Sequence, residues 1–370
     1  MEEVVIVISD LFLTSAAEAA SIRRVDLPGL GHIARYGTGE AVEEGWRPWL
    51  ARWVGRGAVA DEAPATIASA ASRVVSPNFE NERVWIGTPV HFIAGLSSVH
   101  LDARGLLQLE SGIRHTLATE FNSTFAESGF SLEALSSAGF LVRGPQIADM
   151  SANDPARILG ASISEALPPA ADAPALRRLG AEIEMWLHDH EVNRERVARG
   201  DLPVSALWLW GGGPARESVS ARFEAESQAT QTADTVPASA IRGAALLAAT
   251  ALPPPGAAFG RDPYLHGLWR LAGASAQPLP ADFEDILGHT GRRVVIALEL
   301  SQTFETNREW TIRDALADAD KRWIMRALAA LRRGDVERVT VIANDHRLSL
   351  GPRDRLKLWR MPRPALTALQ

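Results

Sequence analysis

Three polar side chains that suit a metal ion follow two of the most apolar runs in the sequence. Asp10 comes just after Val4–Ile8, and Asp345 and His346 come just after Val339–Ile342. In open α/β sheets, ligands bind beyond the carboxyl ends of the strands, so we expect these side chains to meet at one sheet edge. Two carboxylates and an imidazole suit Mn²⁺ or Zn²⁺. We therefore predict a metal site built from Asp10, Asp345 and His346.

A structural interpretation stands beside this one. An Asp after a strand is a common helix N-cap, and an Asp-His pair in a loop often only faces solvent. The chain has no cysteine, so any metal must use O and N ligands. We expect one divalent metal ion or none.

The apolar runs have the pattern of strands that are buried on both faces. Four of them are continuous rather than alternating: Val4–Ile8, Ala206–Trp210, Val294–Leu300 and Val339–Ile342. Helical patterns lie between them, for example from Asp314 to Arg333. Alternating strands and helices predict an α/β fold with a mostly parallel sheet covered on both faces.

The stretch from Ser76 to Leu202 has a different pattern. Short strand patterns there are followed by helical ones at 112–127 and 175–188. We predict an α+β cap, residues 76–202, inserted into a core made of residues 1–75 and 203–370.

Composition narrows the partners and the location. The net charge is −7 and the Lys and Arg residues are scattered, which does not favour nucleic acid as a partner. The N-terminus lacks the basic region of a signal peptide, and no apolar stretch approaches the roughly 20 residues that span a bilayer. We expect a cytoplasmic protein that binds neither nucleic acid nor membranes.

Three segments can be compared with a known family: the first strand with Asp10, the segment Leu27–Gly37, and the last strand with Asn344, Asp345 and His346. They resemble the cofactor-independent phosphoglycerate mutases of the alkaline phosphatase superfamily. The resemblance implies a three-layer alkaline phosphatase-like core.

A middle segment, His190–Arg196, is similar to the His-Pro-Val-Asn-x-x-Arg segment of archaeal-type mutases. This resemblance implies that His190, Asn193 and Arg196 bind an anionic ligand. The alternative is that they lie on solvated or interdomain faces of a helix. Arg347 replaces the glycine that usually follows Asp-His in the mutases, so it could fill the space of a lost cation, bind a phosphate or carboxylate, or simply lie at the surface.

Four further segments are informative: 88–91, 186–190, 208–213 and 355–360. They resemble the bacterial RpfE-type regulatory family. It implies a regulatory protein.

Two departures from an active mutase stand out. That chemistry uses two metal ions and a Ser or Thr nucleophile. The segment Glu43–Leu50, where the resemblance places the nucleophile, has no hydroxyl group. Asp285 and His289 copy the Asp-x-x-x-His-Thr-Gly motif of a second metal site, but they precede a strand instead of following one. By position, Glu299 and Ser301 are better candidates.

These observations favour a phosphoglycerate mutase-like protein with a degenerate metal site, in a regulatory or phospho-ligand-binding role. One alternative is an active metal-dependent phosphomutase or phosphatase. Another is a structural module that binds a protein partner, for which Trp46, Trp49 and Trp53 share one helical face.

Overall fold

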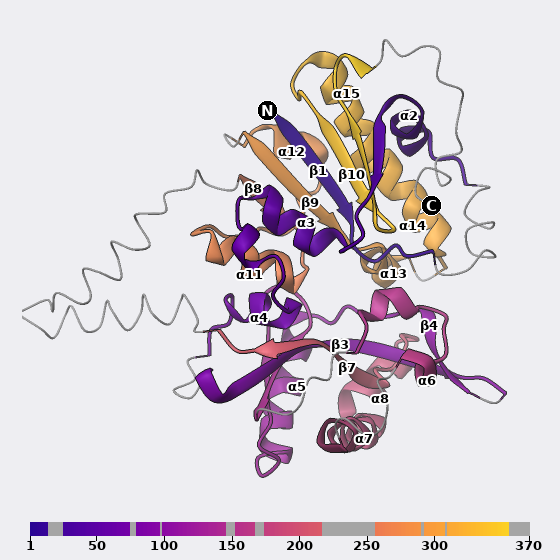
Figure 1. Cartoon of the computed structure of the whole chain (residues 1–370). Coiled ribbons are helices and arrows are strands. Elements are labelled where there is room, and N and C mark those ends of the chain that lie inside the picture. The colour runs from indigo at the N-terminus through magenta and orange to yellow at the C-terminus, as the bar shows by residue number, and fades with distance from the viewer. Residues whose placement is uncertain are drawn as a thin grey trace, which may run out of the picture.

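The computed structural model describes residues 1–13, 25–74, 79–96, 98–145, 152–166, 174–216, 256–289, 292–307 and 309–354. Two β-sheets with their covering helices make up these ranges (Figure 1). The predicted resemblance at 355–360 lies outside them. No helix in the described ranges is long and apolar enough to cross a lipid bilayer.

The larger sheet has six strands in the order β2-β11-β10-β1-β9-β8. The strands β10, β1, β9 and β8 run parallel, whereas β11 and β2 continue the sheet in antiparallel fashion. Their bounds are β1 Glu3–Ile8, β2 Thr38–Ala41, β8 Ala257–Phe259, β9 Arg293–Leu298, β10 Val339–Ala343 and β11 His346–Leu350. The mostly parallel α/β sheet predicted from the apolar runs is therefore confirmed.

Helices cover both faces of this sheet because successive strand side chains point to opposite sides. Val4, Ile6 and Ile8 pack with one set of helices: α2 Pro28–Tyr36, α12 Phe283–Leu287, α14 Ile312–Ala319 and α15 Met325–Arg333. Val5 and Val7 pack with the other set: α3 Trp46–Trp53, α4 Pro64–Ser69 and α11 Pro263–Leu271. This three-layer arrangement is consistent with the expected alkaline phosphatase-like core.

The smaller sheet is antiparallel and is built around the long strand β3, which pairs with β4, β6 and β7. Its strands are β3 Glu82–Ala94, β4 Val99–Leu106, β5 Ser131–Ala134, β6 Phe140–Pro145 and β7 Ala206–Pro214. The helices α5 Ser111–Thr124 and α7 Pro174–His188 pack on one face, and α8 Glu191–Ala198 follows them. The shorter helix α6, Ile163–Ala166, contributes Ala166 to a hydrophobic cluster of the smaller sheet, and α13, Thr303–Thr306, contributes Phe304 to the core of the larger one.

We expected Ala206–Trp210 to be a strand of the parallel sheet, and this was wrong. β7 pairs antiparallel with β3, with Trp210 opposite Ile86. Leu207 faces one hydrophobic cluster of the smaller sheet, and Trp208 and Trp210 face another. A strand with two buried faces reads as a continuous apolar run in either kind of sheet. A cap that contained β7 would end near residue 214. The predicted division, a core of residues 1–75 and 203–370 with a cap of residues 76–202, stays a prediction.

Candidate functional site

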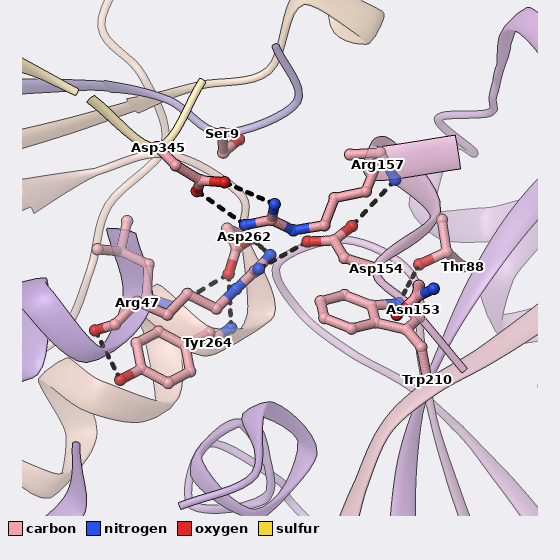
Figure 2. Close-up of polar contacts among 12 residues, drawn as sticks. Ser9, Arg47, Thr88, Asn153, Asp154, Arg157, Trp210, Asp262, Tyr264 and Asp345 are labelled. Atoms are coloured by element: carbon pink, nitrogen blue, oxygen red, sulfur yellow. Dashed lines mark hydrogen bonds and ion pairs between the residues drawn. The ribbon is translucent and has the colours of Figure 1, made fainter. Parts of the chain in front are cut away.

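Four parallel strands end at the side of the larger sheet that faces the smaller one (Figure 1). A small cavity of about 70 Å³ lies there and takes its lining from both sheets. Its polar lining residues are Ser9, Asp10, Arg47, Thr88, Gln108, Asp154, Trp210, Asp262, Glu299 and Ser301. Figure 2 shows these lining residues among their polar contacts: Ser9, Arg47, Thr88, Asp154, Trp210 and Asp262.

Asp10 lies at this edge, as predicted, but both of its carboxylate oxygens have backbone partners. It is buried and accepts N–H bonds from Leu300 at 2.7 Å and Ser301 at 2.8 Å. Burial raises the pKa of Asp10, and these hydrogen bonds lower it by less. The carboxylate thus ties the end of β1 to the loop after β9.

Asn344 and Asp345 form the two-residue connection between β10 and β11. Their φ angles are 48° and 56°, as the central residues of a type I′ hairpin turn require, and Asn and Asp tolerate such angles better than most residues. The carboxylate of Asp345 accepts two hydrogen bonds from Arg157, at 2.6 and 2.8 Å (Figure 2). His346 begins β11, with Nδ1 2.9 Å from the carbonyl oxygen of Asn344.

The carboxylate oxygens of the two predicted aspartate ligands have protein partners in this arrangement. The oxygens of Asp10 accept backbone N–H bonds, and those of Asp345 accept the guanidinium of Arg157. Within the described ranges, no three His, Asp or Glu side chains form a group that could hold a metal. A site for Mn²⁺ or Zn²⁺ at these residues stays a prediction.

Arg47, in the first turn of α3, is a central residue that sequence analysis missed. Its guanidinium pairs with Asp154 at 2.6 Å and Asp262 at 2.9 Å (Figure 2). It also lies over the rings of Trp46 and Trp210. Burial lowers the pKa of Arg47, but the charges and hydrogen bonds of the two aspartates outweigh burial and raise it. Arg47 is therefore a permanent cation within the site.

Asp262 and His266 have the Asp-x-x-x-His spacing that we had noted at Asp285 and His289. Unlike that pair, they follow a strand, β8, on the site side of the sheet. Asp262 caps α11 and pairs with Arg47, while Nε2 of His266 lies 2.9 Å from the Gly260 carbonyl oxygen. Burial lowers the pKa of His266. The motif was missed because β8 has only three residues; Thr290 and Gly291 of the other motif lie outside the described ranges.

Glu299 is the carboxylate of the site best suited to proton transfer. Burial, followed by the negative charges of Asp262 and Asp10, raises its pKa to about 8. Its Oε2 accepts hydrogen bonds from Gln108 at 3.0 Å and Gln302 at 2.8 Å. A carboxyl group that is still protonated at neutral pH can donate a hydrogen bond or a proton to a ligand. Ser301, the other candidate by position, lines the same cavity.

His190 and Asn193 hold the backbone around α8. Nδ1 of His190 accepts the Val192 N–H at 3.1 Å, which caps the helix, and its Nε2 lies 2.9 Å from Glu120. Asn193 donates to the carbonyl oxygens of Leu187 and Val204 and accepts the Val204 N–H. These contacts have a structural role, and ligand binding by either residue stays a prediction.

Arg196 lines a larger cavity of about 550 Å³ beside the first one. Arg104 and Arg199 also line it, together with two acidic residues, Glu110 and Asp201. The Nε of Arg104 is buried without a hydrogen-bond partner in the described ranges, and its guanidinium lies 5.4 Å from the Phe304 ring centroid. The two cavities share the lining residues Leu106, Leu107, Gln108 and Ser301. A basic cavity therefore adjoins the acidic one.

Arg347 lies on β11, directly after the turn that carries Asp345, and its side chain contacts residues outside the two cavities. Its guanidinium pairs with Glu40 at 2.8 Å and lies 5.5 Å from the Trp49 ring centroid. Trp49 and Trp53 stack on each other and are partly buried against the core, while Trp46 is buried within it. Anion binding by Arg347 stays a prediction.

Comparison with known proteins gives two local sequence matches. Over 61 residues, 16% of this chain, it is 43% identical to the 2,3-bisphosphoglycerate-independent phosphoglycerate mutase of Methanothrix thermoacetophila. Over 87 residues, 23% of this chain, it is 33% identical to the 2,3-bisphosphoglycerate-independent phosphoglycerate mutase 2 of Methanothermobacter thermautotrophicus. In these segments the chain is phosphoglycerate mutase-like. The matches span only 16% and 22% of the length of those two mutases, and no protein-family model matches the chain.

Two solved structures align with nearly the whole chain at low similarity. The cofactor-independent phosphoglycerate mutase of Thermoplasma acidophilum is 16% identical, with 95% of this chain and 90% of that one covered and a TM-score of 0.35. A protein of Pyrococcus horikoshii is 11% identical, with 99% and 92% covered and a TM-score of 0.42. Both scores lie below 0.5, a level at which overlap does not by itself establish a shared fold.

Proposed function

We propose that this mutase-like chain has a degenerate metal site and binds a phosphorylated small molecule, in a regulatory or ligand-binding role in the cytoplasm. The observation that carries the proposal is the arginine-lined cavity beside the sheet-edge site. The regulatory role follows from the resemblance to the RpfE-type family.

The larger cavity has the size and charge for a small phosphorylated ligand. Its volume of about 550 Å³ falls within the range of small-molecule sites, and Arg104, Arg196 and Arg199 contribute three guanidinium groups. Guanidinium groups bind phosphate oxygens through charge-assisted hydrogen bonds. Gln108 and Ser301 could extend these contacts toward the smaller cavity, because they line both.

The sheet-edge residues support the degenerate metal site. The mutase reaction requires a nucleophile and a pair of metal ions. Here α3 begins at Trp46 where the resemblance places the nucleophile, and the aspartates of the edge have protein partners. Binding a phosphorylated ligand without turnover needs neither a nucleophile nor a pair of metal ions.

The test is a calorimetric titration of the purified chain with 3-phosphoglycerate, with glycerate as the ligand that lacks the phosphate. We expect 3-phosphoglycerate to bind and glycerate to bind much more weakly. Arg104→Ala should weaken 3-phosphoglycerate binding about tenfold or more, because a charge-assisted contact is lost. Arg313→Ala, at an exposed position on α14, is the matched control. Equal binding of both ligands, or none, would contradict the proposal.

An active metal-dependent phosphomutase or phosphatase is the second candidate, and the local identity to two mutases favours it. Interconversion of 2- and 3-phosphoglycerate that requires added Mn²⁺ and disappears in Asp345→Asn would establish it. If neither binding nor turnover is observed, the remaining candidate is a structural module for a protein partner.

A further inference from the structure

Two arginine side chains pair with carboxylates that lie at the sheet edge. Arg157 binds both oxygens of Asp345, and Arg47 binds one oxygen each of Asp154 and Asp262 (Figure 2). Asp154 and Arg157 belong to the segment 152–166, which packs on the smaller sheet. Arg47 and Asp262 begin helices of the larger one.

Aromatic rings hold both guanidinium groups in place. The Cζ of Arg47 lies 4.5 Å from the Trp46 ring centroid and 4.7 Å from that of Trp210, and its side chain is only 12% exposed. The Cζ of Arg157 lies 4.1 Å from the Phe12 ring centroid. Ring faces attract cations, most strongly where the cation is as buried as Arg47, and an arginine keeps its charge at any ordinary pH.

We infer that Arg47 and Arg157 are built-in cations of this site, which occupy the carboxylates that a divalent metal ion would need. This inference rests on the degenerate metal site of the proposed function and gives the reason why that site is degenerate. A guanidinium bound to both oxygens of Asp345 takes the positions that a metal would coordinate, and its positive charge repels a second cation. Removal of Arg157 should therefore let an ion such as Mn²⁺ bind at the freed carboxylate of Asp345.

The experiment titrates Mn²⁺ into the full chain after treatment with a chelator, and measures free Mn²⁺ by electron paramagnetic resonance. The variants are Arg157→Ala and the double variant Arg157→Ala/Asp345→Asn. Asn suits the left-handed backbone of the turn and keeps the shape of the side chain without its charge. Arg52→Ala is the matched control, because Arg52 also pairs with two carboxylates but away from this site.

We expect Arg157→Ala to bind Mn²⁺ at least about tenfold more tightly than the wild type, because a neighbouring positive charge is gone. The double variant should lose this gain, and Arg52→Ala should behave like the wild type. If Arg157→Ala binds Mn²⁺ no more tightly than the wild type does, the inference is overturned.

Arg157 is partly exposed, so its replacement should leave the fold intact. If circular dichroism shows that Arg157→Ala does not fold, Arg157→Gln carries the same expectation and the same overturning results. The Mn²⁺ titration is independent of the 3-phosphoglycerate titration. If 3-phosphoglycerate does not bind but Arg157→Ala gains Mn²⁺ binding, the phospho-ligand role is rejected and the inference about the built-in cations stands.

Discussion

At Arg47, one guanidinium compensates two carboxylates that have little contact with water. The side chains of Arg47, Asp154 and Asp262 are 12%, 10% and 7% exposed. Charges in such surroundings are stable only when they are paired and hydrogen-bonded. The residue therefore controls the stability of the site as well as its charge.

Replacement of Arg47 by Met should be strongly destabilising. It would leave Asp154 and Asp262 buried and without their cation, which typically costs about 3 kcal/mol of the free energy of unfolding. Urea denaturation measures this loss. Arg52→Met removes an exposed cation with two carboxylate partners and should have no measurable effect. Equal stability of the two variants would contradict this account of Arg47.

Glu299 should make the stability of the protein depend on pH. Its pKa is raised to about 8 in the folded chain, against 4.5 for an ordinary Glu, so the folded state keeps a proton that the unfolded state loses. The contribution of Glu299 is fully present below pH 4.5 and falls as pH rises toward 8, by at most about 1.4 kcal/mol per pH unit.

Glu299→Gln removes this titration while its side-chain oxygen can still accept from Gln108 and Gln302. Urea unfolding of both proteins between pH 5 and 8 should show the variant gaining stability relative to the wild type as pH rises. Parallel profiles would show that Glu299 does not hold a proton in the folded state.

Among the elements, α2 depends on a residue far away in the chain. Its N-cap residue Leu27 provides no side-chain cap, and Asp320 instead accepts the N–H groups of Gly29 at 2.9 Å and Leu30 at 2.6 Å. Asp320 is buried within a π-helical turn, Asp320–Ile324, between α14 and α15. A Cβ on Gly29 would lie 2.8 Å from this carboxylate, so the close approach requires glycine.

Asp320→Ala should lower the free energy of unfolding by about 2 kcal/mol, because two buried N–H groups of α2 lose their acceptor. Hydrogen exchange at Gly29 and Leu30 should accelerate more than exchange in β1. Asp320→Asn keeps one acceptor oxygen and should lose less. A uniform acceleration across the core would indicate general destabilisation in place of a lost helix cap.

Whether an element could be predicted depended on how distinctive its pattern was. Continuous apolar runs identified β1, β9 and β10, because parallel strands are buried on both faces. The same signal misplaced β7, whose two faces are buried in the antiparallel sheet. β8 is too short to carry a pattern, so Asp262 behind it was missed.

Across the whole molecule, the site joins segments that only the tertiary structure brings together. Asp10 and Asp345 could be placed at the sheet edge, because each follows a predicted strand. Their partners could not be predicted, since Arg157 is 188 residues from Asp345 and lies in a segment without periodicity. Sequence patterns identify which residues face an edge, but not which charges from a second sheet meet them.

The central position of β1 has a consequence for synthesis of the protein. β1 lies between β9 and β10, and Val4 pairs with both Val294 and Val339. At ordinary translation rates, the first strand leaves the ribosome roughly 20 to 60 s before its last partner exists. Its run of five aliphatic residues stays without a partner strand for most of that time, until β9 is made, so we expect the nascent chain to bind chaperones that recognise short apolar segments near the ribosome exit.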